Sequence, residues 1–142
     1  MEDHRPRCLA LVAFVALAAL TAAPASAQGN RPVTIAPASA EANVTEGSPA
    51  LFDLHLSSAD ALLPHAARLV LDGPPAGWTY RFTPAVVNLS AGGEANATLV
   101  LYPPASAVAG DVVNFTFHAV EDGPTSIPLS GDVAVSVSIL PP

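Results

Sequence analysis

The feature that most constrains this fold is an alternation of apolar and polar residues, which recurs after Pro24 in short segments separated by turn residues. No segment after Pro24 combines helical apolar spacing with ten or more residues free of proline and glycine. A period of two places every second side chain on one face, as a half-buried β-strand requires. The sequence therefore predicts strands and no long helix.

These alternating segments are short and numerous. Turn residues such as Gly73-Pro74-Pro75 and Asp122-Gly123 stand between them. Many short strands with frequent turns are typical of two packed sheets. We predict an all-β fold, an immunoglobulin-like β-sandwich of seven or eight antiparallel strands. The segments are 50–57, 69–71, 78–82, 87–89, 97–101, 113–117 and 133–139, with a weaker one at 33–35.

Residues 1–27 are typical of a secretory signal peptide. Two arginines precede an apolar run at 9–23, and Ala-Ser-Ala at 25–27 has the small-x-small form of a cleavage site. An uncleaved membrane anchor is the alternative, but about 15 apolar residues fall short of the roughly 20 that a bilayer core needs. We expect a secreted or cell-surface mature chain, residues 28–142, that forms one domain without a membrane span.

The composition of the mature chain excludes several kinds of site and partner. Cys8 precedes the apolar run, so cleavage leaves no thiol for a disulfide, a nucleophile, a zinc–cysteine site or blue copper. Cleavage removes two charges of each sign, which leaves three arginines, no lysine and a formal charge of −7. Nucleic acid and anionic lipid need clustered cations. We therefore expect an extracellular protein or carbohydrate partner.

Turn and strand-end motifs follow one another in a recognisable order after an apolar strand at 51–56. They are Pro75-Ala76-Gly77-Trp78, Phe82-Thr83-Pro84, Leu89-Ser90-Ala91-Gly92-Gly93, 99–104 and Ala109-Gly110-Asp111. Over about two-thirds of the chain this order resembles the NEW domain, which occurs beside alpha-galactosidase-type glycosidases and in prokaryotic surface proteins. The resemblance implies an immunoglobulin-like, accessory, non-catalytic module. It departs at 57–60, where members usually carry an Asn-x-Gly turn.

Four of the five asparagines lie in N-glycosylation sequons, at Asn43, Asn88, Asn96 and Asn114. Chance would place about one there, given the serine and threonine content. In the predicted strands Asn88, Asn96 and Asn114 alternate with apolar neighbours, so we expect all three to point outward, where a glycan fits. The alternative is that strands rich in threonine and serine produce the sequon by composition.

Histidines and acids give a weaker signal for a metal. Asp53 and His55 share one face of a predicted strand and His118 faces outward on another, which makes a surface zinc site conceivable. A zinc site needs a third protein ligand, and none is identifiable in the sequence. Acids beside turns could hold calcium, namely Asp72, Asp111, Glu121, Asp122 and Asp132. Turn chemistry explains the Asp-Gly pairs without an ion, so we predict no metal and no cofactor.

The aromatic residues and the missing catalytic motifs complete the functional expectation. Trp78, Tyr80 and Phe82 share the apolar phase and are predicted as core, which leaves Tyr102 as the exposed aromatic. No Gly-x-Ser-x-Gly, Ser-His-acid set or paired-carboxylate cleft can be placed, so no catalytic residue is predicted. We predict a non-catalytic, N-glycosylated structural or adhesion module.

Two alternatives to that function remain open at this point. A carbohydrate-binding accessory module would need two or more exposed aromatics on one face. A filament or surface-layer subunit would need an exposed, uncharged sheet edge, for which 133–139 is the candidate.

Overall fold

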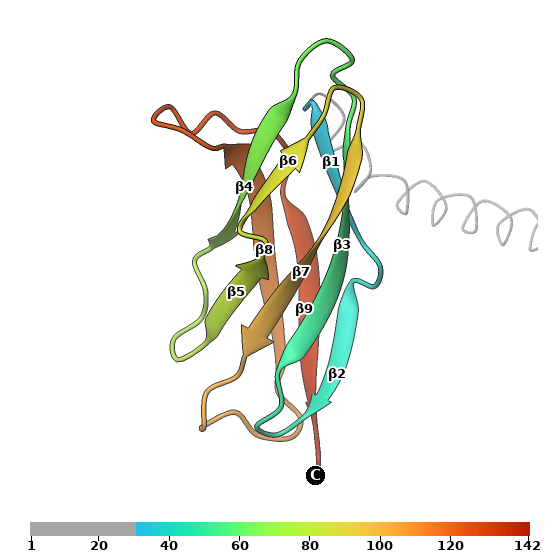
Figure 1. Cartoon of the computed structure of the whole chain (residues 1–142). Coiled ribbons are helices and arrows are strands. Elements are labelled where there is room, and N and C mark those ends of the chain that lie inside the picture. Colours follow the sequence, from blue (N-terminus) through green and yellow to red (C-terminus); the bar gives the residue numbers. More distant parts are fainter. Residues whose placement is uncertain (1–30) are drawn as a thin grey trace, which may run out of the picture. The chain divides into compact units, whose positions relative to one another are not determined.

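The computed structural model describes residues 31–142, which form nine β-strands (Figure 1). The predicted signal peptide, residues 1–27 with Cys8, lies outside the described residues. Within 31–142 there is no helix of the length and apolarity that crossing a bilayer requires. The strands are β1 (Val33–Pro37), β2 (Glu41–Thr45), β3 (Ala50–Ser58), β4 (His65–Asp72), β5 (Thr79–Thr83), β6 (Val86–Leu89), β7 (Glu94–Tyr102), β8 (Val112–Glu121) and β9 (Val133–Leu140).

The strands form two sheets. Sheet A has four strands in the order β1-β3-β7-β5, and sheet B has five in the order β2-β9-β8-β4-β6. Neighbouring strands are antiparallel with one exception, because β2 and β9 run parallel from Glu41 opposite Ser136 to Thr45 opposite Leu140. The predicted all-β sandwich is confirmed.

Three details of the prediction need correction. All eight predicted segments form strands, but β2 adds a ninth among the described residues, and its parallel pairing departs from the purely antiparallel expectation. The alternating residues of β2, Ala42 and Val44, are only half-buried, which explains the weak sequence signal. The third correction concerns 133–139, because β9 pairs with β2 on one side and β8 on the other and is therefore no sheet edge.

The core lies between the sheets and follows the alternation directly. In β3 and β9 buried and more exposed positions alternate along the strand. Trp78, immediately before β5, meets Phe115 of β8 edge-on with ring centroids 4.9 Å apart, and Phe82 meets Phe117 at 5.8 Å. These aromatic pairs join sheet A to sheet B across the core. Burying a side chain of this size contributes roughly 1.5–3 kcal/mol relative to exposure.

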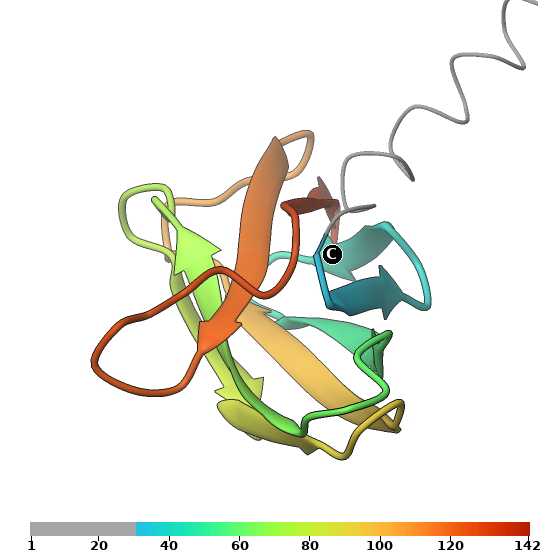
Figure 2. The same ribbon diagram turned by 90° about the horizontal axis from the view of Figure 1, so that it is seen from above.

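Loops that follow β3 and β8 lie at the end of the sandwich away from Pro142 (Figure 1). The backbone N–H of Gly92 donates to the carbonyl of Asp60 at 2.7 Å, and that of Asp122 donates to Ala66 at 2.8 Å. The 122–132 loop, orange to red, stands away from the sheets in both views (Figure 2). These backbone bonds tie the loop after β3 to the turn at Gly92, and the loop after β8 to β4.

Candidate functional site

All four sequon asparagines are exposed. Asn43 lies on β2, Asn88 on β6, Asn96 on β7 and Asn114 on β8. The residues flanking Asn88, Val87 and Leu89, are buried, as the alternation requires. The predicted outward orientation of Asn88, Asn96 and Asn114 is confirmed.

Their positions within the sheets differ. Asn43 and Asn88 lie on β2 and β6, the two edge strands of sheet B, whereas Asn114 lies on β8 inside that sheet, opposite Ser136. Asn96 is on sheet A. Asn88, Asn96 and Asn114 each line a shallow depression, of about 560, 410 and 240 Å³ respectively. Each depression leaves open space beside its acceptor side chain.

Asn96 is held by a histidine on the neighbouring strand. His55 lies opposite Asn96, and its Nδ1 is 3.0 Å from Asn96 Oδ1, while its Nε2 is 2.9 Å from a Glu94 carboxylate oxygen. An Nδ1–H donor to Oδ1 orients the amide and leaves Nδ2, the atom that carries an N-linked sugar, without this contact. Asp53 lines the same depression, but both His55 nitrogens already face other groups and do not pair with it as a catalytic base would.

The zinc hypothesis that combined Asp53, His55 and His118 is wrong. Asp53 and His55 point outward from β3 in sheet A, and His118 points outward from β8 in sheet B. The core between the two sheets separates them. The alternation of residues along a strand shows which face of that strand a side chain occupies, but it does not show which sheet the strand joins.

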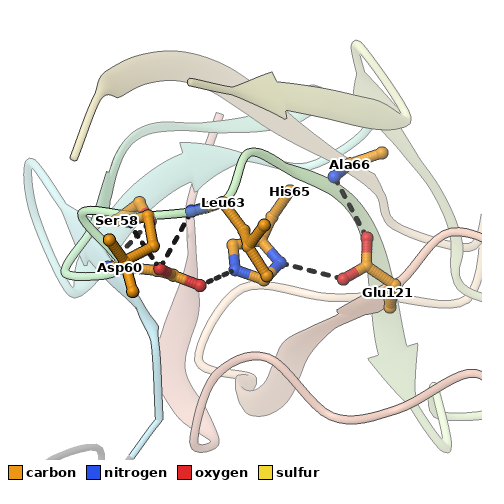
Figure 3. A network of polar contacts seen from close by, with 7 residues as sticks. Ser58, Asp60, Leu63, His65, Ala66 and Glu121 are labelled. Atoms are coloured by element: carbon orange, nitrogen blue, oxygen red, sulfur yellow. Dashed lines mark hydrogen bonds and ion pairs between the residues drawn. The ribbon is translucent and has the colours of Figure 1, made fainter. Parts of the chain in front are cut away.

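A half-buried histidine holds the loop end of the sandwich together. His65, at the start of β4, lies between Asp60 and Glu121: Nε2 is 2.8 Å from Asp60 Oδ2 and Nδ1 is 2.9 Å from Glu121 Oε1 (Figure 3). Asp60 Oδ1 also accepts the backbone N–H groups of Leu62 and Leu63, and Glu121 Oε2 accepts that of Ala66. The network ties the loop after β3 to β4 and β8.

The network raises the pKa of His65 and lowers that of Asp60. Hydrogen bonds to Glu121, and then to Asp60, raise the pKa of His65, because each carboxylate favours the charged ring. The backbone N–H of Leu62, and then His65, lower the pKa of Asp60. Both ring nitrogens are held by acceptors, so this histidine is arranged to brace the fold rather than to exchange protons with a substrate.

The His65 network should make stability fall as the pH rises above neutrality. A folded-state pKa above the unfolded value gives stabilisation that is complete below the unfolded pKa, about 6.5, and is lost as pH rises through the folded value. We expect the thermal midpoint of the protein to decrease as the pH rises above about 6.5. The His65→Gln variant should lack most of this slope, and the variant with exposed His55→Gln should keep it. If the thermal midpoint falls equally with pH in the wild type and in His65→Gln, the His65 network is not the cause of the decrease.

The acids proposed for calcium do not form one group. Asp111 Oδ2 accepts the backbone N–H of Val108 in a turn, Glu121 belongs to the His65 network, and Asp122 pairs with Arg68 at 3.5 Å. These three are each explained by local hydrogen bonds or charge pairing.

The remaining two acids meet a histidine instead. Asp72 at the end of β4 and Asp132 just before β9 both approach His118 on β8, with Nδ1 3.1 Å from Asp72 Oδ2 and 3.8 Å from Asp132 Oδ1. One ligand atom of each residue lies within 4.8 Å of the other two. All three residues were candidate ligands from the sequence, but His118 was considered for zinc, and Asp72 and Asp132 were considered for calcium.

The aromatics do not form a sugar-stacking platform. Trp78 is buried. Tyr80 and Tyr102 are 40% and 37% exposed, but Tyr80 lies opposite inward-facing Leu101 and Tyr102 opposite exposed Thr79, so they occupy opposite faces of sheet A. The exposure of Tyr102 is as predicted. Tyr80 was predicted as core, and it is open to solvent because β5 is an edge strand.

No protein-family profile matches the sequence, and no curated protein matches it significantly. Among solved structures the chain is similar to domains 4 and 5 of the S-layer protein SbsC, with 18% identity over 78% of this chain and 54% of that chain, at a TM-score of 0.49. It is similar to a Bacteroides ovatus protein to which carbohydrate binding has been ascribed, with 13% identity over 77% of this chain and 37% of that one, at a TM-score of 0.54.

A third similar structure is the BIgI domain of the beta protein from S. agalactiae, solved bound to CEACAM1, with 9% identity over 78% of this chain and 98% of that one, at a TM-score of 0.43. The chain spans about half the length of the SbsC fragment and less of the Bacteroides ovatus protein. Identities this low show the fold and not the activity. The protein is an immunoglobulin-like β-sandwich, and its membership of the NEW-domain family stays a prediction.

Proposed function

We propose that this protein is an exported, N-glycosylated immunoglobulin-like module that acts outside the cell as a structural or adhesion unit, without catalysis. The observation that supports it best is the exposure of Asn43, Asn88, Asn96 and Asn114, all on strands of a rigid sandwich. A bulky glycan is tolerated only where the acceptor points into solvent. The four sequons meet that condition.

The edge positions of two sequons give the glycans a physical role. Edge strands present unpaired backbone groups that invite pairing with other chains, and proteins usually protect them with charges or proline. Charged residues are only 12% of this chain. Sugars at Asn43 on β2 and Asn88 on β6 would cover both edges of sheet B. Glycans would then supply the protection against aggregation that charge supplies elsewhere.

The depressions beside three acceptors support the same proposal. They lie next to Asn88, Asn96 and Asn114 and are open to solvent. A sugar attached at Asn96 has Ala36 and Thr98 beside it, so its first ring would pack against the sheet rather than project freely. The His55 contact would hold the Asn96 side chain in place for that packing.

The non-catalytic part of the proposal is supported by the histidine contacts. Reactive sites bring a base, a nucleophile and an open pocket together. Here both ring nitrogens of His55 and of His65 face acceptor oxygens. The NEW-domain resemblance, which implies an accessory module, points in the same direction.

The proposal is tested by intact mass and peptide mapping of the protein purified from its native host. We expect the mass of residues 28–142 plus sugar, with glycopeptides containing one or more of the four sequon asparagines. Asn30, which lies outside any sequon, serves as the internal control and should be unmodified.

Matched variants separate the sequon from the asparagine itself. Ser90→Ala and Thr98→Ala should remove sugar from Asn88 and Asn96 while leaving both asparagines in place, because the hydroxyl residue is part of the acceptor sequence. An unmodified, full-length mass would reject both export with cleavage and glycosylation.

A further inference from the structure

We propose that Asp72, His118 and Asp132 form a zinc-binding site on the outer face of sheet B. The site is independent of the glycosylation proposal, since none of its residues belongs to a sequon.

The strand register brings the three residues together. On adjacent strands, Thr116 of β8 lies opposite Asp72 of β4, and Phe117 lies opposite Val133 of β9. His118 lies one residue after Phe117, next to Asp132, and two residues after Thr116, diagonal to Asp72 on the same face of the sheet. All three side chains point to solvent from the same side of the sheet, at 22% exposure for His118, 41% for Asp72 and 72% for Asp132. Two of the ligands are held by the sheet itself, and Asp132 directly precedes β9.

Both carboxylates face the same nitrogen of His118, and this distinguishes the cluster from the His65 network. At His65 the acids contact opposite ring nitrogens, so no single point is close to all three groups. At His118 both Asp72 and Asp132 approach Nδ1. An ion replacing the Nδ1 proton would have all three ligand atoms around it.

The distances fit a tetrahedral ion. Zinc–nitrogen and zinc–oxygen bonds of about 2.0–2.2 Å place neighbouring ligand atoms of a tetrahedron about 3.4 Å apart. The separations from Nδ1 are 3.1 and 3.8 Å, and all three ligand atoms lie within 4.8 Å of one another. Side-chain rotation of the exposed Asp132 carboxylate closes the remaining gap. Water, which reaches all three side chains, supplies the fourth ligand.

The donor set favours zinc over calcium. Calcium takes six to eight oxygen ligands, whereas this cluster offers two carboxylates and an imidazole nitrogen, which zinc accepts readily. The acids here are not neutralised by the neighbouring arginine, because Arg68 is engaged by Asp122 and Ser126. Two carboxylates on a chain of formal charge −7 attract a divalent cation.

The test is isothermal titration calorimetry of the purified protein with zinc chloride at neutral pH. We expect one saturable zinc per molecule, and an affinity at least about tenfold weaker in His118→Ala and in Asp132→Asn. Calcium chloride in large excess should not displace the zinc. Asp132→Asn changes a largely exposed residue, so it tests the site even if His118→Ala folds poorly.

A matched control uses the other exposed histidine–carboxylate contact. His55→Ala, which removes a ring bound to Glu94 on sheet A, should leave zinc affinity unchanged. A second readout is the NMR signal of the His118 ring, which zinc should shift without moving that of His65. Zinc binding that survives both His118→Ala and Asp132→Asn, or the absence of saturable binding up to about 1 mM zinc, would overturn the proposal.

Discussion

Replacement of Trp78 by alanine should lower the free energy of unfolding by about 3–5 kcal/mol. The side chain is 8% exposed and meets Phe115 of the opposite sheet edge-on at 4.9 Å. Alanine would remove this contact between the sheets and leave a cavity that rigid strands on both sides fill poorly. Chemical denaturation followed by far-ultraviolet circular dichroism measures the loss as a lower midpoint at an unchanged denaturant dependence.

Tyr80 provides the matched control for Trp78. It lies on β5, two residues further along, and contacts Phe82, but it is 40% exposed. Because this side chain is only partly buried, Tyr80→Ala should lower the free energy of unfolding by about 1 kcal/mol or less. A loss below about 1 kcal/mol for Trp78→Ala would show that the tryptophan does not pack in the core.

The sequence predicts the elements of this fold well because each depends on neighbours along the chain. Strands such as β3 and β9 bury every second residue along their whole length, and this pattern needs no knowledge of a partner strand. The segment that was missed, β2, has only the half-buried Ala42 and Val44. Its place as a parallel edge beside β9 depends on a pairing about 95 residues away along the chain.

The polar clusters could not be predicted, because they depend on register between distant strands. His118 is 46 residues from Asp72 and His65 is 56 residues from Glu121. A shift of one residue in either pairing would move these side chains to opposite faces. The orientation of the sequon asparagines could be predicted, because the direction of a side chain depends only on its own strand. Alternation alone placed Asn88, Asn96 and Asn114 on the outside.

The turn before Trp78 should be intolerant of any side chain at Gly77. The N–H of Trp78 donates to the carbonyl of Pro75, and Gly77 has φ +85°, a left-handed conformation that L-residues adopt only at a cost. A Cβ atom on Gly77 would also lie 2.9 Å from Pro104 Cβ, closer than such atoms approach. Gly77→Ala should therefore lower the free energy of unfolding by about 2–4 kcal/mol, measured by chemical denaturation.

Gly47 separates the two causes of this loss. It has nearly the same φ, +82°, in the turn closed by Ser48 and Thr45, and a Cβ atom there would meet nothing within 4 Å. Gly47→Ala should cost only the backbone strain, about 1–2 kcal/mol. The difference between the two variants then measures the collision with Pro104. If the two losses are equal, Pro104 moves aside without cost and the turn is less tightly packed than the structure shows.

A double-mutant cycle of Gly77→Ala with Pro104→Gly shows whether the contact with Pro104 causes the loss of stability. If the added methyl group pushes against Pro104, the double variant should lose less stability than the two single losses together. Because Gly77 directly precedes Trp78, a turn displaced by the methyl group would also loosen the tryptophan from Phe115. Gly77→Ala should then change the near-ultraviolet circular dichroism of the tryptophan, whereas Gly47→Ala should leave that signal unchanged.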